Sequence, residues 1–191
     1  MDMKNIIEAS IAVKQRLLGD EALLSSLAQA VEMSVACLRQ SHRIWFCGNG
    51  GSAADAQHLA AELSGRFYRD RPSLPAEALH CNSSYLTAVA NDYSYEEVYA
   101  RLVNGYCQSG DLLIGLSTSG NSRNIVQAFL AAREHGIYTI GLTGAAGGAL
   151  RDCSDLLLTV PSTDTPRIQE CHILLGHILC EHIERQIFGS A

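Results

Sequence analysis

The sequence of 191 residues has no run of Lys or Arg, and its formal net charge is −6. A protein that binds nucleic acid by neutralising phosphates needs clustered positive charge, which this sequence lacks. No apolar stretch approaches the ~20 residues that span a bilayer. Residues 1–4 also lack the charged-then-apolar order of a signal peptide. We therefore expect neither a nucleic acid nor a membrane as partner.

Paired cysteines are missing as well. The seven cysteines are an odd number, are scattered, and never have the C-x-x-C spacing. This excludes a disulfide framework and a Cys-rich zinc site, and it is typical of reduced thiols in the cytoplasm. Charged residues make up only 18% of the chain and hydrophobic residues 47%, which excludes intrinsic disorder. We expect a globular, cytoplasmic protein with a sizeable core.

Apolar spacing divides the chain into a helical start and an alternating remainder. Apolar residues three and four apart predict two helices within residues 1–40, packed on the core or on a neighbouring subunit. From residue 43 onward, short apolar runs alternate with helical patterns, which indicates βαβ units and a parallel sheet. The predicted strands are 44–47, 76–80, 111–116, 139–142 and 156–160, and the later helices are about 52–67, 84–90, 95–107, 121–135, 147–152 and 166–187. We expect one α/β domain over residues 1–191.

Two loops at the carboxyl ends of predicted strands are rich in Gly and Ser. The Gly loop is Gly48-Asn49-Gly50-Gly51-Ser52, and the Ser loop is Ser117-Thr118-Ser119-Gly120-Asn121-Ser122. Ligands of open α/β sheets bind at such ends, where glycines expose backbone N–H groups and a helix N-terminus adds positive charge. Either loop alone fits a plain turn with Ser and Asn caps, and neither completes a nucleotide fingerprint. Together they predict a phosphate cradle that needs no Lys or Arg.

Metal-ligating residue types occur on two predicted helices. His58 and Glu62 are four apart and share a helix face, so they either converge on one ion or substrate or form a solvated pair. The last helix offers Gln169, His172 and His177. His172 is the better spaced from Gln169, and His177 lies in an apolar run typical of a core histidine. Periodicity does not choose between the two histidines.

Three further polar residues have two interpretations each. Asn91 and Asp92 follow a helical stretch, so they form either a helix-ending turn or a pair that faces a sugar. Arg66 lies beyond His58 and reaches either a phosphate or a neighbouring subunit.

Four motifs carry a resemblance to a known family. They are residues 47–58 (CGNGGSAADAQH), residues 90–93 (ANDY), the Ser loop and residues 167–170 (RIQE). In this order and spacing they resemble bacterial phosphoheptose isomerases, the sedoheptulose 7-phosphate isomerases of lipopolysaccharide heptose synthesis, in the sugar isomerase (SIS) superfamily. The resemblance runs from about residue 5 to 188.

The resemblance implies a flavodoxin-like five-stranded parallel sheet and a homotetramer with active sites at subunit contacts. It implies the interconversion of D-sedoheptulose 7-phosphate and D-glycero-D-manno-heptose 7-phosphate, the first step of ADP-heptose synthesis. It also implies one Zn²⁺ per subunit, bound by His58, Glu62, Gln169 and His177.

The resemblance also assigns the substrate contacts. The phosphate is expected on Ser117, Ser119 and Ser122, with Thr118 alongside. The sugar chain is expected on Asn49, Gly50, Gly51, Asn91 and Asp92. Further substrate-binding residues that the resemblance implies are Ser52, Asp55, Glu62, Arg66 and Gln169. Arg66 matches an arginine that reaches the site of a neighbouring subunit.

These residue types suit the implied chemistry. Aldose–ketose isomerisation through an enediol needs one base that moves a proton between C1 and C2, and a second group that moves protons between the two oxygens. Glu62 is the candidate carbon base and His177 its acid/base partner. Zinc would polarise the substrate oxygens and stabilise the enediolate, although a carboxylate or imidazole bound to zinc is a poorer base.

Two features depart from a simple transfer of the family pattern. Gln169 and His177 are eight residues apart, ~12 Å along a regular helix, so a shared ion requires straight reaches, a late helix start or ligands from different subunits. Some heptose isomerases have an acidic residue directly before Arg-Ile-Gln, where this chain has Pro166, with Asp164 close by.

Three rival functions share these motifs. A non-catalytic paralogue that binds the replication initiator DnaA has the same fold, but it is expected to lack the equivalents of Glu62 and His177, which are present here. An isomerase of another phosphosugar would have similar loops, because a phosphate cradle does not measure chain length. A plain sugar-phosphate sensor would not need the acid/base set. We therefore favour the phosphoheptose isomerase.

Overall fold

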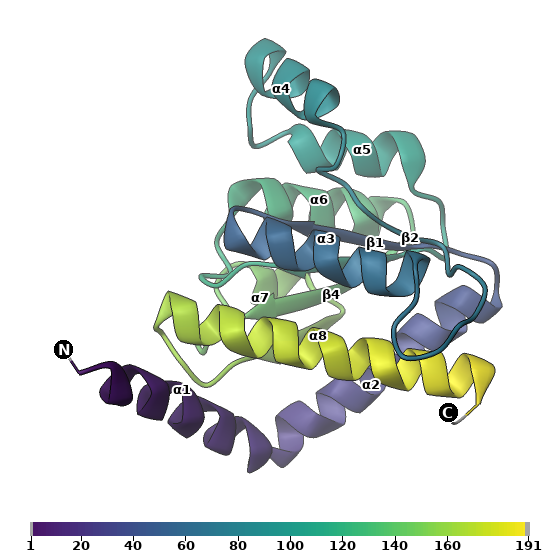
Figure 1. Ribbon diagram of the computed structural model, residues 1–191. Helices are drawn as coiled ribbons and strands as arrows, with labels where there is room; N and C mark the ends of the chain where they lie inside the picture. The colour runs from purple at the N-terminus through teal and green to yellow at the C-terminus, as the bar shows by residue number, and fades with distance from the viewer. Residues whose placement is uncertain (1, 190–191) are drawn as a thin grey trace.

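Five parallel strands form one sheet at the centre of the computed structural model, which describes residues 2–189 (Figure 1). The strands are β1 (Ile44–Gly48), β2 (Ala76–Ala78), β3 (Leu112–Leu116), β4 (Tyr138–Thr143) and β5 (Leu156–Thr159). Their order across the sheet is β2-β1-β3-β4-β5, which confirms the flavodoxin-like topology. The connections reverse direction between β1 and β3, so the ligand crevice of this fold class lies beyond the carboxyl ends of these two strands.

Helices cover both faces of the sheet. The described helices are α1 (Met3–Leu18), α2 (Glu21–Arg39), α3 (Gly51–Ser64), α4 (Ser83–Asp92), α5 (Val98–Tyr106), α6 (Arg123–Glu134), α7 (Leu150–Cys153) and α8 (Thr165–Phe188). The core on one face contains residues of α1, α2, α3 and α8, and the core on the other face contains residues of α4 to α7. Figure 1 shows α4 standing beyond α5, outside the layer next to the sheet.

The strand side chains divide between two cores with a period of two. In β1, Ile44 and Phe46 join the core under α2, α3 and α8, whereas Trp45 and Cys47 join the core under α5 and α6. Because both faces are covered, β1 and β3 are buried along their whole length, whereas the edge strand β2 carries the exposed Glu77. This is why short apolar runs were sufficient to predict the central strands.

Boundaries differ from the predictions by a few residues, and local bonds explain the larger shifts. Helix α5 begins at Val98 rather than near residue 95, because the Glu97 amide bonds to the Ser94 carbonyl in a turn. Strand β2 ends at Ala78 rather than residue 80, because the Cys81 amide turns back to the carbonyl of Ala78.

Helix α2 has the length of a membrane span, although no apolar stretch of such a length was expected from the sequence. By length and mean hydropathy (1.2) this one helix is apolar enough to cross a bilayer. Its residues Leu27, Val31 and Val35 are buried in the core next to the sheet. A core helix passes the same test, so the length of α2 is weak support for a membrane span.

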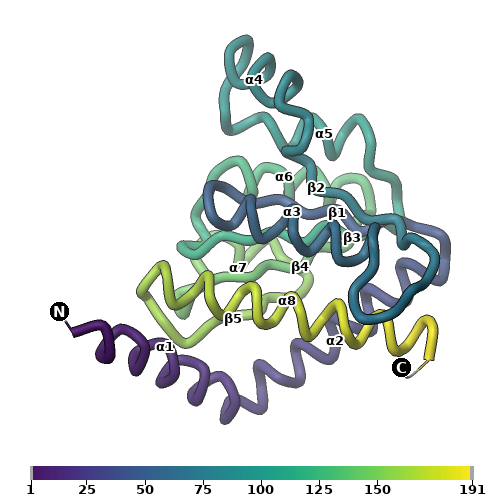
Figure 2. The backbone as a smooth tube through the Cα atoms, in the orientation of Figure 1, coloured from purple at the N-terminus to yellow at the C-terminus, as the bar shows by residue number. Residues whose placement is uncertain are grey.

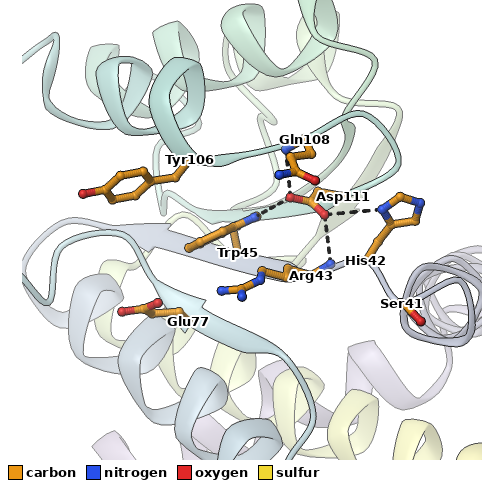
Figure 3. Close-up of a pocket in the computed structure, with 8 residues that line it drawn as sticks. All are labelled: Ser41, His42, Arg43, Trp45, Glu77, Tyr106, Gln108 and Asp111. Atoms are coloured by element: carbon orange, nitrogen blue, oxygen red, sulfur yellow. Dashed lines mark hydrogen bonds and ion pairs between the residues drawn. The ribbon is translucent and has the colours of Figure 1, made fainter.

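A buried carboxylate ties the amino ends of β1 and β3 together (Figure 3). Asp111 is 3% exposed and accepts hydrogen bonds from the Arg43 amide at 2.9 Å, the Trp45 indole at 2.8 Å and the Gln108 amide at 3.0 Å. His42 lies 3.7 Å away on the other side. The residues that form these bonds line a cavity of about 560 Å³ at the amino ends of the strands, opposite the Gly and Ser loops.

Asp111→Ala should destabilise the fold by roughly 2–4 kcal/mol, because two backbone amides and an indole N–H lose a charged acceptor. Urea unfolding followed by circular dichroism measures the change. Asp152→Ala, at an exposed position on α7, is the matched control and should change stability by less than about 0.5 kcal/mol. Equal losses in the two variants would contradict the structural role of Asp111.

Candidate active site

The Gly loop turns β1 directly into α3. Gly50 has φ +56° and ψ −122°, a conformation that a residue with a Cβ rarely adopts. The amides of Ser52 and Ala53 bond to the carbonyls of Asn49 and Gly50, so the helix begins immediately after the strand. Its N-terminus therefore lies at the ligand edge of the sheet, as predicted.

The Ser loop turns β3 into α6 at the neighbouring position. The Ser117 and Ser122 hydroxyls are hydrogen-bonded at 2.9 Å, and Ser119 Oγ accepts from the Asn121 amide at 3.1 Å. Ser117 is buried, whereas Ser119 is exposed at the mouth of the loop. Hydroxyls gather just before the N-terminus of α6, an arrangement that accepts an anion without a cationic side chain.

A pair of carboxamides joins the two loops. Asn49 Nδ2 donates to Asn124 Oδ1 at 2.9 Å, and Asn124 Nδ2 donates back to Asn49 Oδ1 at 2.8 Å. The Tyr95 hydroxyl donates to the same Asn49 oxygen at 3.0 Å. The Asn49 side chain is thus largely engaged within the protein and sets the spacing of the loops. Sequence reasoning missed Asn124 and Tyr95, because their partner lies far along the chain.

His58, Glu62 and His177 lie together where α3 meets α8. His58 Nε2 is 2.9 Å from Glu62 Oε1 and 3.3 Å from His177 Nε2. His58 Nε2 is therefore close to both a carboxylate oxygen and a second imidazole nitrogen. The ligand atoms of the three residues all lie within 4.8 Å of one another. Two imidazoles and a carboxylate form a donor set typical of a zinc site with an open fourth position.

Close packing of the two helices makes this cluster. At Gly176 a side-chain carbon would come within 2.5 Å of Leu59, so only glycine allows α8 to approach α3 this closely. This close approach brings the rings of His58 and His177 next to each other, with centroids 5.0 Å apart. The Phe67 ring lies on the other side of His177, with centroids 5.7 Å apart. His177 is held between two rings.

The structure distinguishes the two histidines that periodicity left open. His172, the better-spaced partner by sequence, is fully buried, and its Nε2 donates to the Thr143 carbonyl at 3.2 Å. His177 is the histidine that joins His58. Spacing left the choice between the two histidines open, and in the structure α8 turns His172 toward β4 and the core.

Gln169 lies beside the start of α3. Helix α8 runs unbroken from Thr165, so a late helix start does not bring Gln169 closer to His177. The Gln169 carboxamide lies against the N-terminus of α3, where a side-chain carbon on Gly51 would be 2.8 Å from its nitrogen. Gln169 is therefore next to the Gly loop, eight residues before His177 on the same helix.

The other predicted residues divide between this edge and the surface. Asp55 lies on α3 near the histidines; burial raises the pKa of its carboxyl, and the charges of His58 and His177 oppose that rise. Asn91 and Asp92 are exposed at the end of α4 and bond to each other at 2.9 Å. Arg66 is exposed on the loop after α3, where its guanidinium bonds to the Phe67 carbonyl.

A small cavity next to the Ser loop adds hydroxyls that sequence reasoning missed. It measures about 260 Å³ and is lined by Thr118, Ser119, Gly144, Ala145, Ala146, Ser162, Thr163, Thr165 and Ile168. The residues from Ser162 onward follow β5, at the same edge of the sheet. The rule that located the other two loops, polar residues after a strand, also applies to this segment.

Comparison with known proteins agrees with this geometry. The SIS domain family matches residues 8–144. A phosphoheptose isomerase of Sulfurimonas denitrificans is 49% identical over 188 residues, which covers 98% of this chain and 96% of that protein. The chain belongs to the phosphoheptose isomerase family.

Two solved members of the phosphoheptose isomerase family have the same fold. GmhA from Neisseria gonorrhoeae is 42% identical with a TM-score of 0.89, covering 95% of this chain and 96% of that one. A phosphoheptose isomerase from Francisella tularensis is 36% identical with a TM-score of 0.92, covering 96% of each chain. The similarity extends past the SIS match into α8, the helix that carries His177.

Acidification should destabilise the protein through His172. Burial lowers the pKa of His172 to about 4 from an ordinary 6.5, despite the bond to Thr143. As pH falls from 6.5 toward 4, the unfolded chain binds a proton that the folded chain excludes, so the free energy of unfolding falls by roughly 3 kcal/mol.

Urea unfolding at intervals of pH tests this expectation. His172→Gln keeps an N–H donor but cannot titrate, so its stability should vary less with pH across that window than that of the wild type. The carboxylates shared by both proteins cancel in the comparison. Parallel pH profiles for the two proteins would contradict a buried, neutral His172.

Proposed function

We propose that this protein is an aldose–ketose isomerase that interconverts D-sedoheptulose 7-phosphate and D-glycero-D-manno-heptose 7-phosphate, the entry step of heptose biosynthesis. The observation that carries the proposal is the cluster of His58, Glu62 and His177 at the ligand edge of a phosphoheptose isomerase fold. A carboxylate and imidazoles in contact supply the groups that proton transfer through an enediol needs. The presence of both Glu62 and His177 favours an enzyme over the DnaA-binding paralogue.

In this reaction the loops position the substrate and the cluster moves its protons. Backbone amides and hydroxyls of the Ser loop bind the phosphate at the N-terminus of α6. Glu62 removes the proton from C2 of the aldose and returns it to C1, which converts the aldehyde into the ketose by way of the enediol. His177 donates a proton to O1 and accepts the one from O2, so the enzyme ends in its starting protonation state.

Zinc is part of the proposal. The donor atoms of His58, Glu62 and His177 fit this ion, and the resemblance adds Gln169 as a fourth ligand. When bound, the ion would polarise the substrate oxygens and stabilise negative charge on the enediolate. The position of Gln169 beside Gly51 also suits contact with the sugar chain.

The proposed assembly is a cytoplasmic homotetramer with sites at subunit contacts. Helix α1 exposes a row of large apolar side chains that a second subunit would cover, namely Met3, Ile6, Ile7, Ile11 and Leu18. Arg66, Asn91 and Asp92 are exposed, so they are available to the site of a neighbouring subunit. All seven cysteines are free thiols, which supports a reducing compartment.

Turnover of sedoheptulose 7-phosphate by the purified protein tests the reaction. Glu62→Gln and His177→Ala should each lower kcat by about 10²–10⁴, the usual contribution of a general acid or base. His135→Ala, at the end of α6, is the matched control and should keep wild-type turnover. If folded wild type with zinc gives no turnover, the heptose assignment fails, and shorter phosphosugars and DnaA binding become the next assays.

Metal removal tests the cofactor separately. Dialysis against a chelator should abolish most turnover, and added Zn²⁺ should restore it, because the ion stabilises the enediolate. His58→Ala should bind Zn²⁺ more weakly than wild type in a competition titration. Full activity of protein that elemental analysis shows to be metal-free would contradict the zinc proposal.

A further inference from the structure

A buried carboxylate lies two helical turns beyond His177. Glu184 is 2% exposed, and the hydrogen bonds that its carboxylate accepts come from the loop that follows α3. It accepts from the backbone amides of Phe67 at 3.3 Å, Tyr68 at 3.0 Å and Arg69 at 3.0 Å, and from Arg71 Nε at 2.9 Å. Four donors on one carboxylate fix the loop to α8. Figure 2 shows this loop folding down beside the final turns of α8.

The partner guanidinium connects this carboxylate to the end of α3. The Arg71 side chain is only 2% exposed. Its terminal nitrogens donate to the carbonyl oxygens of Glu62 at 2.8 Å, Leu63 at 2.7 Å and Pro72 at 3.0 Å. These include carbonyls of the last helical turn, which lack partners within α3. Arg71 thus caps α3 on the backbone of the candidate carbon base itself.

The Arg71–Glu184 pair bridges the two helices that make the catalytic cluster. Glu184 follows His177 by seven residues, which places the two on nearly the same face of α8. Arg71 holds Glu62 at the end of α3, and Glu184 also holds the backbone of Phe67, whose ring packs on His177. Both groups that must meet in the reaction are therefore connected to one buried ion pair.

We propose that Arg71 and Glu184 are positioning residues that set the separation of His58 and Glu62 from His177, and hence the affinity of the cluster for its metal and the rate of proton transfer. This rests on the proposed function, although neither residue touches the substrate. A solely stabilising ion pair would affect folding and leave the metal affinity of folded protein unchanged. A positioning pair changes both.

The experiment compares Glu184→Gln, Arg71→Met and the double variant with the wild type. Competition with a chromophoric chelator measures Co²⁺ and Zn²⁺ affinity, and steady-state assays give kcat and KM separately. Each single variant should weaken metal binding by about 10–100-fold, as loss of residues that orient ligands does. It should lower kcat by a similar factor with KM changed less. The double variant should lose no more metal affinity and kcat than the more affected single variant, because the pair acts as one unit.

Two controls separate positioning from stability. Glu181→Gln breaks the exposed Arg185–Glu181 pair on the same helix and should leave metal affinity and kcat unchanged. Phe129→Leu destabilises the opposite face of the sheet, and it should lower the melting temperature without changing metal affinity. Arg71→Lys keeps a cation beside Glu184 but loses the forked hydrogen bonds to the α3 carbonyls. Its metal affinity should therefore lie between those of Arg71→Met and the wild type.

A crystal structure of Glu184→Gln tests the geometry without any assay. The distance between His58 Nε2 and His177 Nε2 is 3.3 Å in the wild type. It should increase by about 1 Å, a displacement large enough to lower kcat a hundredfold. An unchanged distance, or metal affinity reduced no more than in Phe129→Leu, overturns the proposal. Absence of turnover by the wild type overturns the proposed function instead, so the two failures are distinct.

Discussion

The close packing of α3 on α8 is the constraint on which the site depends. Gly176 on α8 leaves room for Leu59 on α3. His58 and His177 are the sequence neighbours of these two residues, and they meet beside this contact. A methyl group at residue 176 would move the helices apart and separate the histidines. The fold thus places Gly176, which has no side chain, next to His177, whose side chain the proposed reaction needs. At this point the requirements of packing and of chemistry coincide.

The two halves of the candidate site are held by different kinds of force. Neutral carboxamides, Asn49 and Asn124, join the Gly loop to the start of α6. A buried ion pair, Arg71 and Glu184, joins α8 to the end of α3 and the loop after it. Paired carboxamides bring no net charge to the proposed phosphate cradle, which would bind an anion through N–H and O–H dipoles alone. The charged pair lies at the far end of α3, away from that anion.

Much of the fold could be predicted because the signals were local. The strands were short apolar runs, and the Gly loop needed a residue such as Gly50 that tolerates a positive φ. The Ser loop followed from its position after β3. The site was less accessible from the sequence: spacing on α8 left both His172 and His177 open, and only the resemblance selected His177. Which face of a helix meets its neighbour depends on Gly176 and Leu59, residues that carry no chemical signature of their own.

The cluster also joins distant parts of the chain, since His58 and His177 are separated by 119 residues. The long-range hydrogen bonds of α8 run to α1, α2, α3, β4 and the loop at residues 65–73. Helix α8 also contributes Leu175, Leu179 and Ile183 to the core next to the sheet. Separation of α8 from α3 would therefore open that core together with the candidate site. The lifetime of the candidate site is for this reason tied to the lifetime of the core itself.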